Sequence, residues 1–88
     1  MHDTYLLHNI SDELMRLCKE SNIAKVNQVI IGVNPGSHIN NSNLLDYLNE
    51  NHREIVGSNI ELIIRKEDIE EHTAIIHNVI GESIVQEE

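Results

Sequence analysis

The chain has 88 residues, no Trp, no Phe and only two Tyr, so we expect one domain with a small aliphatic core. Acidic residues outnumber basic ones by 15 to 6, which argues against binding to nucleic acid or to anionic membranes. The single cysteine, Cys18, excludes an intramolecular disulfide and a Cys-x-x-Cys zinc site. With no signal peptide pattern and no apolar run near the ~18–20 residues of a membrane span, the sequence predicts a cytoplasmic protein.

The chain starts with Met1-His2-Asp3, which is a candidate metal site. A terminal amine, the next backbone nitrogen and the His2 imidazole form a compact set of nitrogen donors, which Ni(II) and Cu(II) prefer in square-planar geometry. The imidazole is neutral over much of the physiological pH range and can therefore bind a metal. Asp3 could orient the metal-bound imidazole or cap the helix that follows. The alternative is that His2 has no role.

Residues 4–20 are predicted to form an amphipathic helix. Apolar residues recur at steps of three and four, which places them on one helix face. These residues are Leu6, Leu7, Ile10, Leu14, Leu17 and Cys18. Asp3 or Thr4 would cap the start, and Asn22 tolerates the left-handed conformation that often ends a helix. The candidate metal site would then lie exposed at the start of this helix.

Residues 25–33 are predicted to form a strand, since Val29, Ile31 and Val33 alternate onto one face. The segment Asn34-Pro35-Gly36-Ser37 predicts a type II turn. Residues 41–54 are predicted to form a second helix, which is capped within the 40–42 segment and ended by Gly57.

Residues 59–66 alternate apolar and polar side chains and are predicted to form a second strand, with Ile60, Leu62 and Ile64 on one face. The charged segment 66–71 reads as a tight connection. Residues 73–80 are compatible with helix or strand; their β-branched content and Gly81 favour a strand that returns antiparallel to 59–66.

We therefore predict one α+β domain over residues 1–88. Two helices would pack on one face of a mainly antiparallel sheet of three strands, with a short fourth strand possible at the extreme N-terminus. An open sheet edge invites pairing, so a homodimer through that edge is predicted.

The order of these parts resembles the HypA-type hydrogenase nickel-incorporation proteins. The matching pieces are Met1-His2-Asp3 and the segments 6–17, 26–33, 44–48, 57–62 and 74–82. Segment 57–62 resembles the family's Gly-Ser-x-hydrophobic-Glu-hydrophobic strand, and segment 74–82 resembles its closing strand. The resemblance spans nearly the whole chain, and its one chemically specific element is His2.

This resemblance implies a metallochaperone that binds Ni(II) transiently through His2 and N-terminal backbone nitrogens. Its partners would be proteins of hydrogenase or urease maturation. The chain departs from the family in having Asp3 where glutamate is usual, and in having residues 66–72 where the family carries a zinc module. No structural zinc is therefore expected. The alternative function is a metal-independent protein-interaction or regulatory module that keeps the fold.

The remaining candidate residues point to structural roles. His8, His38, His52, His72 and His77 are scattered, and no pair has the i,i+4 spacing of a two-histidine metal site. Glu70-Glu71-His72 could add metal ligands, but a solvated acidic turn is the simpler interpretation. His77 is interpreted as a satisfied sheet histidine and Cys18 as a core residue. No phosphate loop or nucleophile motif is present, so no enzymatic activity is predicted.

Overall fold

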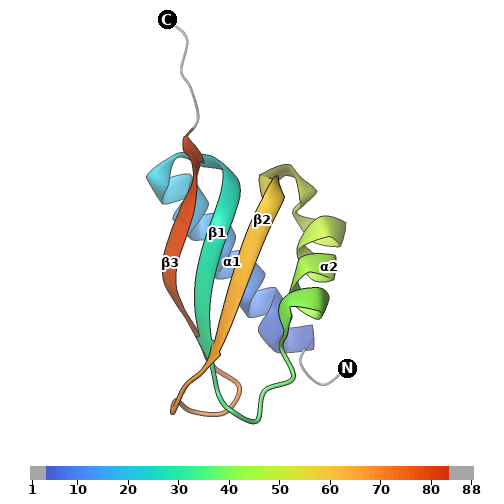
Figure 1. Ribbon diagram of the computed structural model, residues 1–88, viewed down its shortest axis with the longest axis vertical. Helices are drawn as coiled ribbons and strands as arrows, with labels where there is room; N and C mark the ends of the chain where they lie inside the picture. Colours follow the sequence, from blue (N-terminus) through green and yellow to red (C-terminus); the bar gives the residue numbers. More distant parts are fainter. Residues whose placement is uncertain (1–3, 84–88) are drawn as a thin grey trace, which may run out of the picture.

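The computed structural model describes residues 4–83, in which two α-helices pack against a three-stranded sheet. The elements are α1 (Thr4–Ser21), β1 (Ile23–Val33), α2 (Asn41–Asn51), the short 3-10 helix η1 (Arg53–Ile55), β2 (Val56–Lys66) and β3 (Ala74–Ser83). Helix α1 crosses one face of the sheet, and α2 runs beside β2 (Figure 1). The predicted α+β class is therefore confirmed.

The strand order is β2-β1-β3, with β1 at the centre. Strand β1 pairs parallel with β2 and antiparallel with β3. Strand β3 does run opposite to β2, as predicted, but its partner is β1. Helix α2 carries the chain back to the start of β1, which makes β2 parallel, as in other crossover connections. The short connection after β2 then reverses the chain, and β3 pairs with the free side of β1.

The core is aliphatic and lies between the helices and one face of the sheet. Buried apolar side chains come from both helices, from two strands and from the segments between them: Leu6, Ile10, Leu14, Cys18, Val26, Val29, Ile31, Val33, Ile39, Leu44, Leu48, Ile55 and Leu62. Strand β3 adds half-buried side chains to this cluster. Removal of this surface from water, at about 25 cal/mol per Å², is the main stabilising contribution.

Helix α1 begins and ends close to the predicted positions. Its inner face buries four of the predicted apolar residues, and Leu7 and Leu17 are half-buried. Ser11 is also buried on this face, where its hydroxyl donates a hydrogen bond to the His8 carbonyl at 2.9 Å. After the helix, Asn22 has a φ of 57°, so the predicted left-handed residue is confirmed.

The turn after β1 differs from the predicted type II. That turn requires a positive φ at its third residue, but Gly36 does not have one. Instead, the Gly36 amide donates a hydrogen bond to the Asn34 side-chain oxygen at 2.8 Å, and the Ser37 amide donates to the Asn34 carbonyl at 2.9 Å. The Asn34 side chain thus shapes this turn, as asparagine does in Asx turns.

Helix α2 starts as predicted but ends earlier. Asn40 is its N-cap, with Asn43 completing a reciprocal capping box. The helix stops at Asn51, and η1 follows. Gly57 does not end this segment, because it lies inside β2 and is buried. A side chain there would come within 2.6 Å of the Val26 carbonyl oxygen, so glycine allows β2 to approach β1.

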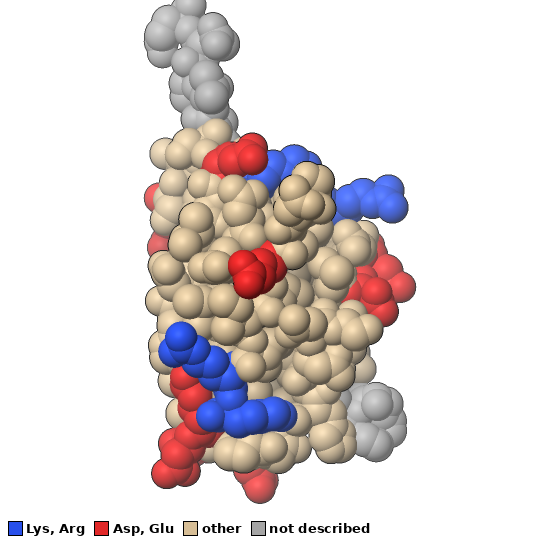
Figure 2. All heavy atoms as spheres, viewed as in Figure 1, with Lys and Arg blue, Asp and Glu red and all other residues tan. Residues whose placement is uncertain are grey.

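The outward face of the sheet carries both charged and uncharged side chains. Figure 2 shows this face, with an acidic side chain near its middle, basic side chains across its lower part and uncharged surface between them. Ile30 pairs with Ile63 of β2, and Ile80 and Ile75 of β3 pair with Gln28 and Gly32, the β1 positions two residues before and after Ile30. We call the four residues Ile30, Ile63, Ile75 and Ile80 the outer isoleucine patch. Ile75 and Ile80 are 44% and 49% exposed. Apolar side chains of this size on a sheet face are a common feature of contact surfaces.

Two further sequence predictions concern a fourth strand at the N-terminus and the lack of a membrane-spanning segment. The possible fourth strand at the extreme N-terminus lies outside residues 4–83. Over those residues, neither α1 nor α2 has the length and apolar content of a membrane-crossing helix.

Candidate functional site

The predicted metal ligands Met1, His2 and Asp3 lie outside the described residues, and α1 starts directly after them at Thr4. Thr4 is exposed, and the Tyr5 side chain is 72% exposed. The predicted helix start directly after the tripeptide is confirmed, whereas the metal site predicted for Met1-His2-Asp3 lies outside the described residues.

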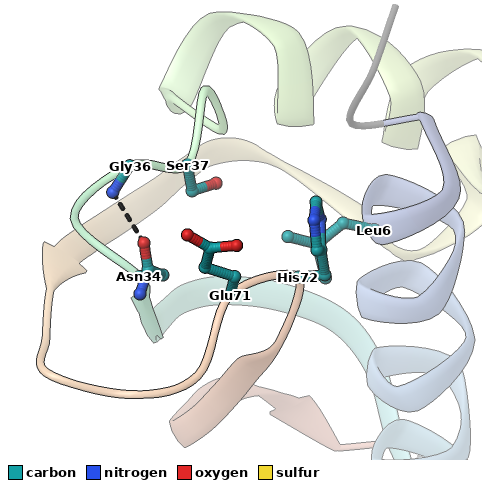
Figure 3. Close-up of a pocket in the computed structure, with 6 residues that line it drawn as sticks. All are labelled: Leu6, Asn34, Gly36, Ser37, Glu71 and His72. Atoms are coloured by element: carbon teal, nitrogen blue, oxygen red, sulfur yellow. Dashed lines mark hydrogen bonds between the residues drawn. The ribbon is translucent and has the colours of Figure 1, made fainter.

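A cleft of about 190 Å³ lies beside the first turn of α1. Three separate segments form it: α1, the loop after β1 and the connection between β2 and β3. The lining residues are Leu6, Asn34, Gly36, Ser37, Glu71 and His72 (Figure 3). The sequence did not reveal this cleft, because it depends on how two loops meet the start of a helix.

Hydrogen bonds hold the two loops together at this end of the sheet. The Asn34 side-chain amide donates to the Ile69 carbonyl at 2.6 Å, and the Lys66 amine donates to the Ser37 carbonyl at 2.6 Å. The Glu67 amide also donates to the Val33 carbonyl at 2.7 Å. The connection between β2 and β3 is thus fixed against the loop that follows β1.

Glu71 and His72 bring carboxylate and imidazole groups to the cleft. The Glu71 carboxylate points towards Ser37 and Asn34, and the His72 ring lies beside Leu6 (Figure 3). His72 has a φ of 64°, a left-handed conformation that histidine adopts more readily than most residues. His72 also lines a second cleft of about 250 Å³, which includes residues of α1 further along the helix. The imidazole therefore lies between the two clefts.

The described residues alone do not form a complete metal site. Within residues 4–83, no three His, Cys, Asp or Glu side chains gather as a metal ion would require. Two ligand-type side chains, Glu71 and His72, do lie in the cleft beside the start of α1. A metal site at this position would need further donors from elsewhere.

Two other histidines form side-chain pairs that the residue pattern alone did not identify. On α1, His8 Nε2 lies 3.1 Å from an Asp12 carboxylate oxygen, and His8 Nδ1 lies 3.3 Å from the Tyr47 hydroxyl. The i,i+4 spacing of His8 and Asp12 could have revealed the first contact. The contact with Tyr47 depends on how α1 and α2 pack together.

His77 lies in β3 and pairs with Glu67. Its Nε2 lies 2.9 Å from both Glu67 carboxylate oxygens. The strand is irregular here: Ile30 pairs with Asn78 and Ile31 with Ile76, so His77 is the extra residue of a bulge. His77 is thus a sheet histidine with a partner, as interpreted from the sequence.

Cys18 is a free thiol in the core, as predicted, with 3% of its surface exposed. Burial raises the pKa of the Cys18 thiol above its usual value, because the apolar surroundings disfavour the thiolate. A protonated, buried thiol is a poor nucleophile and a poor metal ligand. Cys18 therefore belongs to the packing of α1.

Comparison of this chain with protein-family models, with curated proteins and with solved structures found no match.

Proposed function

We propose that this protein is a nickel-binding, metallochaperone-like protein that serves maturation of a nickel enzyme of the hydrogenase or urease type. His2 and the N-terminal backbone nitrogens hold Ni(II), with Asp3 next to them. The observation that carries the proposal is a Met1-His2-Asp3 start joined directly to α1, whose first two residues, Thr4 and Tyr5, are exposed. Nitrogen donors in this arrangement suit Ni(II).

The order of the observed elements supports the proposal. Helix, strand, helix and two strands follow one another in the order on which the resemblance to HypA-type proteins rests. The family's zinc module would stand between β2 and β3, where this chain has only residues 67–73. The proposal therefore assigns nickel binding to this domain and requires no zinc. The acidic surface suits a cation as cargo.

Titration of Ni(II) into the full chain tests the proposal. We expect one Ni(II) per chain, and we expect binding to disappear in His2→Ala and in a chain extended by residues before Met1. His52→Ala, with its change at the end of α2, is the matched control and keeps full affinity. Unchanged affinity in either N-terminal variant would refute the proposed site.

A second candidate function is a metal-independent protein-interaction or regulatory module. The outer isoleucine patch favours it, because exposed apolar side chains on an uncovered sheet face suit a protein partner. Pull-downs with and without added nickel separate the two functions. Recovery of a nickel-enzyme maturation protein only with nickel supports the first function, whereas a partner recovered equally without nickel supports the second.

A further inference from the structure

The outward face of the sheet is centred on β1, the middle strand. Val29 and Ile31 are buried in the core, so the alternate positions Gln28, Ile30 and Gly32 lie on the outward face. We propose that this face is the contact surface between two copies of the chain, which pack face to face about a twofold axis that crosses the strands at Ile30. This contact leaves the free edge of β3 unpaired, and it does not depend on nickel binding.

The four residues of the outer isoleucine patch are arranged for such a contact. Ile30 and its register partner Ile63 lie on the axis, so each lies opposite the same residue of the second copy. Ile80 and Ile75 lie beside the β1 positions two residues before and after Ile30. Rotation about the axis exchanges these two positions and brings Ile80 of one copy opposite Ile75 of the other. Because these two side chains are 49% and 44% exposed, the contact removes apolar surface from water.

Strand β2 has opposite charges at the two corresponding positions. Glu61 and Arg65 are exposed and lie two residues before and after Ile63. The same rotation brings Glu61 of each copy opposite Arg65 of the other, so that two ion pairs form across the contact. Among residues 4–83, the Arg65 guanidinium has no hydrogen-bond or ion-pair partner, and the Glu61 carboxylate accepts one hydrogen bond, from Gln28 Nε2 at 3.0 Å.

The geometry of packed sheets permits these pairs. Two sheets that pack face to face lie about 10 Å apart, with strand directions within about 30° of each other. Two residues along a strand cover about 7 Å, so a rotation of this size displaces the opposing position by only about 4 Å. The long side chains of glutamate and arginine can bridge this separation.

The charge of the chain also favours this face for contact with a second copy. The net charge is −9, so two copies repel each other wherever their acidic surfaces meet. The other carboxylate near the centre of the face belongs to Glu67, which lies over Gly32 and is paired with His77 Nε2 at 2.9 Å. Gln28 of the second copy lies opposite this carboxylate, and its amide can donate a hydrogen bond to it. A second copy therefore matches both the apolar and the charged residues of this face.

Charge reversal on β2 tests the inference. Glu61→Arg places an arginine opposite Arg65 of the second copy, and Arg65→Glu places a glutamate opposite Glu61. In analytical ultracentrifugation, we expect the dimer dissociation constant of either variant to rise at least about tenfold, because like charges in contact oppose association. An equimolar mixture of the two variants should associate again, since each arginine then lies opposite a glutamate of the other chain.

Glu50→Arg in α2 and Arg53→Glu in η1 are the matched controls. They change the net charge by the same amounts at exposed positions outside the three strands, and they should leave the association unchanged. Glu61→Arg makes the chain less acidic, so weaker association of this variant cannot result from net charge. Circular dichroism checks that each variant keeps the fold.

NMR spectra of the unaltered chain locate the contact without any substitution. We expect the methyl signals of Ile30 and Ile63 to shift as the protein concentration rises, while those of the buried Ile39 stay unchanged. Association that neither shifts these signals nor responds to the two charge reversals would overturn the inference in favour of pairing through the edge of β3. A chain that stays monomeric at all concentrations would also overturn it, and the patch would then be available to a different protein.

Discussion

Leu14 and Cys18 lie one turn apart on the inner face of α1, with 0% and 3% of their surfaces exposed. Ser11 is buried beside them and satisfies its hydroxyl within the helix. The side chains of Leu14 and Cys18 fill space and exclude water. The buried Ser11 hydroxyl would be unsatisfied without its hydrogen bond to the His8 carbonyl. Substitutions here should therefore change stability by amounts that depend on the side chain removed.

Leu14→Ala should lower the free energy of unfolding by roughly 2–5 kcal/mol, because it removes buried apolar atoms and leaves a cavity. Chemical denaturation followed by circular dichroism measures the change. Tyr5→Ala is the control on the same helix, and its exposed side chain should contribute less than about 0.5 kcal/mol. Equal stability of Leu14→Ala and the unaltered protein would show that α1 does not pack as described.

Cys18 should make stability fall as pH rises above about 9, the ordinary thiol pKa. Folding raises the pKa of this thiol, so the native protein keeps its proton when the unfolded chain loses it. Below that pH both states are protonated, and the stabilising contribution is fully present. The difference in unfolding free energy between the unaltered protein and Cys18→Ala, measured across this range, isolates the effect from other titrating groups. A difference independent of pH would contradict it.

At the scale of the elements, neighbouring segments can approach the central strand closely at positions where the residue is glycine. Gly57 lies in β2 next to the Val26 carbonyl of β1, near the point where the parallel register shifts. Gly32 lies on the outward side of β1, where a Cβ would collide with the Glu67 carboxylate. Gly57 therefore allows β2 to lie close to the backbone of β1, and Gly32 leaves room for the Glu67 side chain over the central strand.

Gly57→Ala should destabilise the protein by about 1–3 kcal/mol, because a Cβ at this position is too close to a backbone oxygen that cannot move freely. Gly36→Ala is the matched control. Its Cβ would lie 3.2 Å from the Asn34 side-chain oxygen, and Gly36 has no positive φ. Thermal unfolding of both variants checks the prediction, and equal melting temperatures would contradict it.

The elements that the sequence predicted correctly share one property: their signals are local. Periods of 3.6 and 2 residues marked α1 and both strands of the parallel pair, and Asn40 marked the start of α2. The position of β3 next to β1 was not predicted, since no local signal specifies which side of a strand a later strand will occupy. Gly57 was misread for the same reason, because its role depends on a contact with β1.

The candidate site was only partly predictable. The sequence singled out the Met1-His2-Asp3 start, which lies outside the described residues, and the Glu70-Glu71-His72 run, but it did not predict the cleft that Glu71 and His72 line. The cleft beside Leu6 arises from the packing of three segments that are distant in sequence. His72 lies in this cleft because its backbone is left-handed and because α1 packs beside it. A residue pattern encodes neither feature.

At the scale of the whole molecule, the described sheet has two edge strands, β2 and β3. Helix α2 runs beside β2, whereas no helix runs beside the free edge of β3 in the described part of the chain (Figure 1). The outer isoleucine patch extends onto β3 through Ile75 and Ile80. An unpaired strand with apolar side chains next to it is prone to pair with another chain.

We therefore expect the protein to form homodimers through β3 at high concentration. Analytical ultracentrifugation over a range of concentrations measures this association. Ile80→Lys should shift the equilibrium to monomer, because a charge beside an edge strand opposes pairing. Asn49→Lys, at an exposed position of α2, is a control for the added charge. A strict monomer at all concentrations would contradict the prediction.

The central position of β1 also affects the order in which the protein can fold as it is synthesised. Strand β1 leaves the ribosome early, but its antiparallel partner β3 is made after every other described element. Until then, one side of β1 has unpaired backbone groups, although α1, α2 and β2 are already present. A nascent chain stalled before residue 74 should therefore bind holdase chaperones, and it should release them once β3 has emerged.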